Sequence, residues 1–412
     1  MTDMSDAPEQ AVIIARAAGS RPGALTNRAS ARPGEMADCP ALDYLIETCW
    51  RFGFRDILLL ADLEPEDVAA CVERARAVLP AACSLTGLAV DRRSLGTAGV
   101  IRHAGDRLQE RFLLLRDDSV LDTNWLDLVL AAGCDTLAVM ALLRVGDTSR
   151  RGAVTTEGER VTGFTAHGRV QAGLTDGGVY LVDRRIIAHM PRIGSLERAV
   201  LPDLAARGLV RSRVQEGQLL ETGAPEASTR AELLDLRRRV AVFFDRDGTL
   251  NVDEGYSHRP QDLAFLPGAI DAVKRVNDLG HYAFLVTNQS GVARGYFTEA
   301  DVEAFNAHLQ RKLRAAGAHL DDIRYCPDHP EGTVPRYRRV SDWRKPAPGM
   351  LLDLMKRWPI RREASLVVGD KESDVAAAQS AGLRGVLYAG GSLDECLAPH
   401  LPTRRSAADV LS

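Results

Sequence analysis

Two aspartates at the end of an apolar run are the residues of this sequence best suited to chemistry. Residues 240–244 read Val-Ala-Val-Phe-Phe, and Asp-Arg-Asp-Gly-Thr follows directly from Asp245. An unbroken apolar run is typical of a strand buried on both faces of a parallel sheet, and ligand sites lie beyond the carboxyl ends of such strands. We therefore expect Asp245 and Asp247 to share a crevice, where they could bind a divalent cation and perform nucleophilic and acid–base work.

A calcium-binding loop is the alternative interpretation of two carboxylates close to a glycine. An EF-hand loop needs more oxygen ligands ahead of its glycine, and it needs a helix on each side. The sequence around Asp245 has neither feature, so we favour the site at the end of a strand.

The composition limits the classes of partner. The chain has 412 residues, which is enough for two domains, and its net charge of −4 does not suggest nucleic acid or an anionic membrane as a partner. No apolar run approaches the roughly 18 residues that span a bilayer, and the first ten residues lack the features of a signal peptide. The seven cysteines are scattered and form no Cys-x-x-Cys pair, as in proteins of a reducing cytoplasm. We expect a cytoplasmic protein without a nucleic-acid or membrane partner.

Three further polar signatures follow Asp245 in order. They are Thr287-Asn288-Gln289-Ser290 after the apolar run 282–286, then Arg344-Lys345-Pro346, and then Gly369-Asp370 after the apolar run 366–368. Each lies at the end of an expected strand or in a loop. In this order they resemble the signatures of the haloacid dehalogenase (HAD)-type phosphatases. Within that superfamily, residues 239–392 resemble most closely the D,D-heptose 1,7-bisphosphate phosphatases, and they share much with the histidinol-phosphate phosphatases.

The residues and this resemblance together indicate a mechanism. Asp245 attacks phosphorus to form an aspartyl-phosphate, and Asp247 serves as general acid and then general base. Thr287 and Lys345 stabilise the transferring phosphoryl group. Mg²⁺ is expected on Asp245, the carbonyl of Asp247 and Asp370, whereas Asp374 is expected to start a helix or support these ligands. The resemblance implies that the substrate, a sugar phosphate, is bound by Asp253, Glu254, Gly255, Tyr256, Asn288, Gln289, Ser290 and Arg344, of which Arg344 could grip a second phosphate.

The sequence departs from this family at its zinc loop. The family's ligands are a Cys-x-His pair followed by a Cys-x-Cys pair. The first pair falls on Cys326 and Asp328 here, with His329 one position late, and the second falls on Ser341 and Trp343. Too few ligands remain for a four-coordinate structural zinc, so we expect none. We expect Trp343 to fill the vacated space by packing.

The first half of the chain alternates between strand and helix signals, which implies a mostly parallel sheet. Strands are expected at 11–15, 57–61 and 112–115, and helices at 39–52 and 65–79. Eight segments of this half carry a resemblance to one enzyme family. They are residues 11–15, 42–46, 52–57, 95–99 (Leu-Gly-Thr-Ala-Gly), 112–115, 161–164 (Val-Thr-Gly-Phe), 178–180 and 220–225. From about residue 10 to 227 the chain therefore resembles the sugar-1-phosphate nucleotidyltransferases, which implies their fold.

The active-site residues of that family are largely replaced. Its loop Gly-Gly-x-Gly-Thr-Arg, whose amides cradle phosphates, reads Arg-Ala-Ala-Gly-Ser-Arg at residues 16–21, and no lysine precedes Lys274. Two interpretations follow. The half is either a pseudo-enzyme domain, which could bind a nucleotide or nucleotide-sugar, or a divergent transferase using Arg21, Arg32, Asp118 and Glu221. We favour the first, because arginine does not simply replace a lysine at a phosphate.

The whole chain is expected to be α/β with two domains. Residues 1–227 form the nucleotidyltransferase-like domain with a mixed, GT-A or Rossmann-like sheet, and residues 228–239 form a linker helix that ends in a solvated basic run. Residues 240–395 form the HAD-like domain with a Rossmann-like parallel sheet, and residues 396–412 form a tail. The favoured function is a Mg²⁺-dependent sugar-bisphosphate phosphatase. The alternatives are a bifunctional phosphatase and nucleotidyltransferase, a histidinol-phosphate phosphatase, and a binding module without catalysis.

Overall fold

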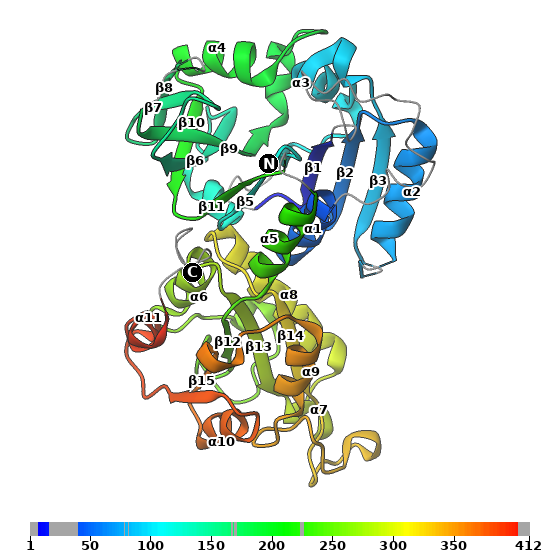
Figure 1. Cartoon of the computed structure of the whole chain (residues 1–412). Helices are drawn as coiled ribbons and strands as arrows, with labels where there is room; N and C mark the ends of the chain where they lie inside the picture. Colours follow the sequence, from blue (N-terminus) through cyan, green and yellow to red (C-terminus); the bar gives the residue numbers. More distant parts are fainter. Residues whose placement is uncertain are drawn as a thin grey trace. The chain divides into compact units, whose positions relative to one another are not determined.

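The chain divides into two compact units, Met1–Asp235 and Leu236–Ser412 (Figure 1). The computed structural model describes residues 7–15, 40–77, 79–80, 82–165, 168, 171–222 and 226–402. Each unit has its own sheet and its own hydrophobic core, so the expected α/β class with two domains is confirmed.

The first unit is built on a mixed sheet of nine strands in the order β3-β2-β1-β4-β9-β6-β10-β8-β7. The strands are β1 (Gln10–Ala15), β2 (Asp56–Ala61), β3 (Ser84–Ala89), β4 (Arg111–Arg116), β6 (Ala138–Val145), β7 (Ala153–Glu157), β8 (Arg160–Thr165), β9 (Gly173–Asp183) and β10 (Val210–Gln215). The first four are parallel to one another, and β9 runs antiparallel between β4 and β6. A separate ribbon pairs β5 (Ser119–Asp122) with β11 (Gln218–Glu221).

The helices of the first unit are α1 (Pro40–Arg51), α2 (Pro65–Arg76), α3 (Arg92–His103), α4 (Leu201–Ala206) and α5 (Glu226–Arg237), with short turns at Gly105–Arg107, Trp125–Ala131, Arg184–His189 and Leu196–Val200. The strands and helices expected for residues 11–115 are present. Helix α2 ends three residues earlier than expected. Helix α1 buries the expected face, Leu42, Leu45, Ile46 and Cys49.

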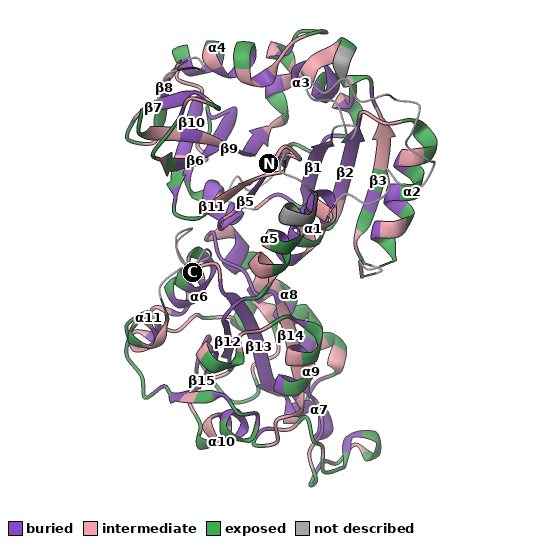
Figure 2. Ribbon diagram, in the orientation of Figure 1, coloured by how far each residue is buried: buried purple, intermediate pink, exposed green. Residues whose placement is uncertain are grey.

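The second unit contains a parallel sheet of five strands in the order β14-β13-β12-β15-β16. The strands are β12 (Ala241–Phe244), β13 (Tyr282–Asn288), β14 (Asp322–Cys326), β15 (Leu366–Gly369) and β16 (Arg384–Leu387). Strand β12 is central and pairs in parallel with β13 and β15, and all four of its residues are buried (Figure 2). The expectation of a strand buried on both faces is therefore confirmed.

Helices cover both faces of this parallel sheet. They are α6 (Ala269–Asp278), α7 (Ser290–Ala293), α8 (Glu299–Ala315), α9 (Gly349–Arg357), α10 (Glu372–Ser380) and α11 (Leu393–Leu397), with short turns at Pro260–Asp262, Pro335–Tyr337, Arg362–Ala364 and Ala398–His400. Residues of α6, α8 and α11 pack in one core with Val242 and Phe244 of β12. On the other face, Phe284 of β13 contacts Phe243 and Trp358, which follows α9.

Two features near the ends of the second unit differ from the sequence-based expectations. Arg239 does not belong to a solvated helix end. Its side chain is buried, donates a hydrogen bond of 2.7 Å to the carbonyl of Gly280 and lies over the ring of Tyr282. Helix α5 ends two residues earlier, at Arg237, and the chain turns inward there. At the other end, Leu397 of α11 is buried in the core, so the packed chain extends beyond residue 395.

Candidate active site

Asp245 lies directly after the central strand β12, and its backbone N–H donates to the carbonyl of Val368 in β15 (2.9 Å). The side chain is almost fully buried. The Lys345 ammonium donates to Asp245 Oδ1 and to the carbonyl of Val286 (2.8 Å), and it lies 2.6 Å from Asp374 Oδ1. One lysine therefore bridges two buried carboxylates at the carboxyl ends of three neighbouring strands.

These three charges change one another's pKa. Burial raises the pKa of Asp245 to about 7, even though the nearby Lys345 lowers it, and Asp374 adds a further repulsive charge. Burial acts to lower the pKa of Lys345, but the carboxylates of Asp245 and Asp374 outweigh it and raise that pKa. Lys345 therefore remains an ammonium ion and compensates the buried negative charge.

Asp247 is held by side chains that the sequence analysis did not assign to it. Arg246 donates to both of its oxygens (3.1 and 3.0 Å), Asn251 donates to Oδ1 (3.0 Å) and Gln289 donates to Oδ2 (2.8 Å). Arg246 itself is fully buried, with its guanidinium over the ring of Phe305. The sequence did contain a signal for this contact: Arg246 stands between Asp245 and Asp247, and a buried arginine requires acidic partners.

Three carboxylates form a group that could hold a metal ion. Asp245, Asp370 and Asp374 each offer an oxygen, and these oxygens lie within 4.8 Å of one another. Asp370 Oδ1 is shielded from solvent and accepts no hydrogen bond among the described residues. A Cβ at position 248 would lie 2.4 Å from Asp370 Oδ2, so the glycine there keeps the space around that carboxylate open. This oxygen-rich, shielded set fits a hard cation such as Mg²⁺.

Residues 287–290 lie at the end of β13 and directly after it, and their side chains differ in what they contact. Thr287 is buried, and its hydroxyl accepts a hydrogen bond of 2.9 Å from the amide of Gln289. The amide of Asn288 donates to the carbonyl of Lys345 and accepts from its N–H (both 3.0 Å). Asn288 and Gln289 therefore position Lys345, Thr287 and Asp247 rather than presenting free groups to a substrate, whereas Ser290 begins α7.

The expected substrate loop, residues 253–256, lies at the surface of the unit. Asp253 accepts a hydrogen bond from the N–H of Gly255 (2.9 Å), and Glu254 is exposed. Tyr256 adopts a positive φ of 62° and packs edge-on against Tyr296. Arg344, also expected to bind the substrate, is half-buried, and its guanidinium donates to the carbonyl of Asp328 (3.4 Å).

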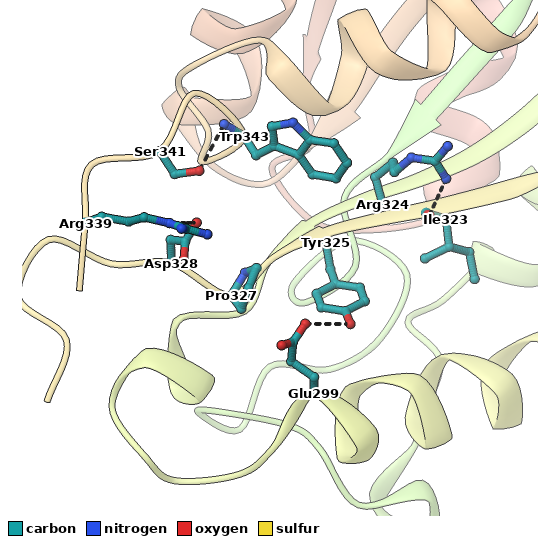
Figure 3. Close-up of a pocket in the computed structure, with 9 residues that line it drawn as sticks. All are labelled: Glu299, Ile323, Arg324, Tyr325, Pro327, Asp328, Arg339, Ser341 and Trp343. Carbon is teal, nitrogen blue, oxygen red and sulfur yellow. Dashed lines mark hydrogen bonds and ion pairs between the residues drawn. The ribbon is translucent and has the colours of Figure 1, made fainter. Parts of the chain in front are cut away.

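The segment expected to lack zinc forms part of a pocket of about 420 Å³, lined by Glu299, Ile323, Arg324, Tyr325, Pro327, Asp328, Arg339, Ser341 and Trp343 (Figure 3). Arg339 Nε lies 2.9 Å from the buried Asp328, and the thiol of Cys326, two residues earlier in the chain, is also buried. Trp343 does not fill this space. Its side chain stays 37% exposed at the pocket wall, where it packs against the backbone of Gly349, and the ion pair of the exposed Arg339 with Asp328 also lines the pocket.

A family described as HAD-hydrolase-like matches residues 342–411 of this chain. The D-glycero-beta-D-manno-heptose-1,7-bisphosphate 7-phosphatase of Rhodopseudomonas palustris is 46% identical over 157 residues, which cover 38% of this chain and 87% of that protein. The protein of the same name from Escherichia coli K12 is 44% identical over 170 residues, 41% of this chain and 86% of that protein. The C-terminal part of this chain belongs to the heptose-bisphosphate phosphatase family.

Membership of the heptose-bisphosphate phosphatase family makes the second unit a phosphoric monoester hydrolase. The HAD-hydrolase-like match includes Arg344, Lys345, Asp370 and Asp374, four of the residues gathered at the site described above. In the part of the chain that the structure describes, no helix is both long and apolar enough to cross a membrane.

The residues proposed for a nucleotidyltransferase site lie outside the heptose-bisphosphate phosphatase part. Arg21 and Arg32 fall outside the described residues. Asp118 accepts a hydrogen bond of 2.7 Å from Arg116, whose guanidinium also pairs with Asp176 and Glu197. Glu221 pairs with Arg150 (3.0 Å) and Arg151 (3.6 Å). The structure therefore places each of these two carboxylates against arginine.

Two solved structures are similar to this chain, each over a different part of it. The D,D-heptose 1,7-bisphosphate phosphatase from B. bronchiseptica, complexed with magnesium and phosphate, is 32% identical and covers 41% of this chain and 92% of that one, with a TM-score of 0.34. HddC from Yersinia pseudotuberculosis is 19% identical and covers 54% of this chain and 97% of that one, with a TM-score of 0.43. It has also been solved with GMP-PN.

Proposed function

We propose that the second unit, in its residues 240–395, is a Mg²⁺-dependent phosphatase that acts on a sugar bisphosphate, most closely D-glycero-β-D-manno-heptose 1,7-bisphosphate. The observation that carries this proposal is the buried group of Asp245, Lys345 and Asp374 beside a firmly held Asp247. The sugar is proposed from the names of the similar phosphatases, which span this unit.

Asp245 carries out the first chemical step. One of its carboxylate oxygens attacks phosphorus, and the bond between phosphorus and the sugar oxygen breaks. Asp247 gives its proton to the leaving sugar oxygen. The hydrogen bonds from Arg246, Asn251 and Gln289 fix the position of Asp247 and favour its ionised form, so the carboxyl group displaces one of these donors when it takes up the proton.

Water completes the reaction. Asp247 takes a proton from a water molecule, whose oxygen attacks phosphorus of the aspartyl-phosphate, and inorganic phosphate leaves with Asp245 restored. Lys345 and Thr287 offer an ammonium and a hydroxyl to the charge that builds on the phosphoryl oxygens. Mg²⁺, held by Asp245, Asp370 and the carbonyl of Asp247, would supply positive charge against these closely spaced anions.

Phosphate release with and without Mg²⁺ tests this proposal. We expect turnover of the heptose bisphosphate to exceed that of histidinol phosphate, and to stop in EDTA and return with added Mg²⁺. Asp245→Asn keeps the shape of the side chain but removes the attacking anion, so the rate should fall by a factor on the order of 10³ or more. Asp278→Asn, on the surface of α6, is the matched control and should retain full activity.

Each failure has a distinct meaning. An Asp245→Asn variant with most of the activity would show that another residue is the nucleophile. A preference for histidinol phosphate would retain the mechanism but reject the proposed sugar. Activity that EDTA does not affect would reject the metal.

We also propose that the first unit does not transfer nucleotides. A metal-dependent transferase needs free carboxylates to hold the ion. Asp118 and Glu221 are instead paired with Arg116 and with Arg150 and Arg151. Burial opposes the charge of Arg116, but Tyr180 and the nearby carboxylates outweigh it and raise its pKa, so this internal cation is permanent. A bound nucleotide or nucleotide-sugar without turnover is compatible with this proposal.

A further inference from the structure

An ion pair joins the two limbs of the long loop after β14 (Figure 3). The first limb is residues 326–329, and the second is residues 337–344, which lead directly to Lys345. Asp328 of the first limb lies 2.9 Å from Nε of Arg339 in the second. The environments of the partners differ, because the side chain of Asp328 is 4% exposed whereas that of Arg339 is 63% exposed. This contact is called the loop clamp below.

The buried carboxylate of Asp328 depends on Arg339 for a compensating charge. Its Oδ1 is shielded from solvent and accepts no hydrogen bond among the described residues, whereas Oδ2 pairs with Arg339. The hydrogen bond to Asp328 and its negative charge in turn raise the pKa of Arg339. A surface ion pair usually contributes little, but removal of the cation from a buried carboxylate is costly, because the remaining charge has lost its solvent.

The loop clamp lies between the positions at which the heptose-bisphosphate phosphatases carry zinc ligands. Two such positions lie on each limb, and they fall here on Cys326 and Asp328 and on Ser341 and Trp343. An ion held by both pairs would tie the limbs together. The side chains present do not fit zinc, because they are a protonated thiol, a carboxylate that is already paired, a hydroxyl and an indole. Arg339 makes the connection between the limbs that such an ion would make.

The second limb connects the loop clamp to the reaction centre. Five residues lie between Arg339 and Lys345, and the last of them, Arg344, donates from its guanidinium to the carbonyl of Asp328 (3.4 Å). The ammonium of Lys345 contacts the nucleophile Asp245. A shift of one limb relative to the other would therefore displace the lysine that compensates the nucleophile.

Other contacts also hold these segments. The N–H of His329 donates to the carbonyl of Tyr337 (3.1 Å), which joins the limbs through their backbones. The side chain of Asn288 exchanges two hydrogen bonds of 3.0 Å with the backbone of Lys345. These contacts add no positive charge beside Asp328. Loss of the loop clamp would therefore leave a buried anion, which is relieved only when the limbs part and admit water.

We propose that Arg339 is a positioning residue, which through its ion pair with Asp328 holds the limb that carries Lys345, in place of a zinc ion. The kinetic part of this inference rests on the proposed phosphatase function, whereas the part that concerns the loop does not. Arg339 acts through Lys345, which every phosphoryl substrate meets, so its removal should affect all such substrates alike.

Kinetics of the full-length protein test the position of Lys345. We measure kcat and KM with D-glycero-β-D-manno-heptose 1,7-bisphosphate and with p-nitrophenyl phosphate for the wild type, Arg339→Gln, Arg339→Lys and Asp328→Asn. Arg338→Gln is the matched control, because Arg338 directly precedes Arg339 and is also exposed. Thermal unfolding of each variant reports on folding separately.

We expect Arg339→Gln to lower kcat about 10- to 100-fold for both substrates, the scale of a small misplacement of a catalytic group. Arg339→Lys keeps the positive charge and should retain most of the kcat. Asp328→Asn leaves no buried charge, so it should lower the unfolding temperature less than Arg339→Gln does, and it should lower kcat about threefold to tenfold. Arg338→Gln should match the wild type.

A second comparison exchanges the loop clamp for a metal ion. Three substitutions are made together, and with Cys326 they complete a set of four zinc ligands: Asp328→His, Ser341→Cys and Trp343→Cys. We expect this triple variant to retain one zinc ion per chain after dialysis, as measured by elemental mass spectrometry, because its limbs lie close enough to share an ion. Addition of Arg339→Gln to the zinc-bound triple variant should then leave kcat unchanged, since the ion joins the limbs.

Four results would overturn the inference and leave the phosphatase proposal intact. The first is an Arg339→Gln variant with a lower unfolding temperature but an unchanged kcat, which would make its role purely structural. The second is a loss confined to the bisphosphate, which would place Arg339 in substrate binding. The others are a triple variant without zinc and an equal loss of kcat from Arg339→Gln with zinc bound. A wild type inactive on both substrates would instead overturn the proposed function and the inference together.

Discussion

At the scale of single residues, the second unit contains two groups of charged side chains that differ in whether opposite charges are paired. At the reaction centre, Lys345 is placed between Asp245 and Asp374, so positive and negative groups compensate one another. Near the loop after β14, Arg294 Nη2 lies 3.5 Å from His329 Nε2, and Arg294 forms no ion pair among the residues that the structure describes. Only the first arrangement supports a nucleophile.

At the scale of secondary-structure elements, parallel strands explain why distant residues meet. The carboxyl ends of β12, β13 and β15 lie at one edge of the sheet, so Asp245, Thr287 and Asp370 converge although 125 residues separate the first from the last. Helix α10 begins at the same edge and places Asp374 in its first turn, where it accepts a hydrogen bond from the N–H of Lys371 (3.1 Å). Asp374 thus starts a helix, as expected, and also pairs with Lys345.

The loop after β14 leads to a prediction about metal content. Its buried Asp328 is paired with Arg339, and Cys326 is buried with a pKa raised by that burial. A zinc site needs deprotonated thiolates, and this loop supplies one protonated thiol and one carboxylate already in use. We expect the purified protein to contain no stoichiometric zinc after dialysis, as measured by elemental mass spectrometry, with the phosphatase activity retained.

One zinc ion per chain that resists dialysis would contradict this prediction. His329→Gln would then show whether that imidazole had been recruited as a ligand, because loss of the zinc in this variant would assign it.

At the scale of the whole molecule, two units with separate cores are joined in one chain, and only the second presents carboxylates arranged for a metal among the described residues. The first unit contains the Arg116 group, in which one guanidinium pairs with Asp118, Asp176 and Glu197. This guanidinium pairs with all three carboxylates of the group and would compete with a metal ion for them.

The first unit is therefore predicted to be inactive as a transferase. We expect full-length protein with heptose 1-phosphate, Mg²⁺ and GTP, ATP, CTP or UTP to release pyrophosphate no faster than a sample without protein. Loss of a positioned cationic donor typically costs on the order of 10² to 10³ in rate, and several are absent here. Phosphate release from the heptose bisphosphate, measured on a second aliquot of the same preparation, shows that the second unit is folded.

Robust pyrophosphate release with any of the four nucleotides would contradict this prediction if Asp118→Ala abolished it. Such a result would establish a bifunctional enzyme, in which the product of the phosphatase is the substrate of the transferase.

The sequence by itself determined the elements that carry the site. The apolar runs before Asp245, Thr287 and Asp370 were sufficient to predict buried parallel strands, because an unbroken run of this kind is stable only when both faces are covered. The order of the motifs then predicted that Asp245 and Asp370 meet, and the missing ligands at Asp328 and Ser341 predicted a loop without zinc. These conclusions depend on local patterns, which a sequence displays directly.

Only the tertiary structure decided which polar groups pair with which. Gln289 could equally have faced a substrate, but it is buried against Asp247 and Thr287. From the sequence, Arg239 was expected at a solvated helix end, but its guanidinium lies over the ring of Tyr282. Arg294 and His329 come together from two separate segments, and no spacing in the sequence predicts this contact. Pairing of this kind depends on distances between elements that are remote in the chain, and electrostatic and hydrogen-bond energies change steeply with those distances.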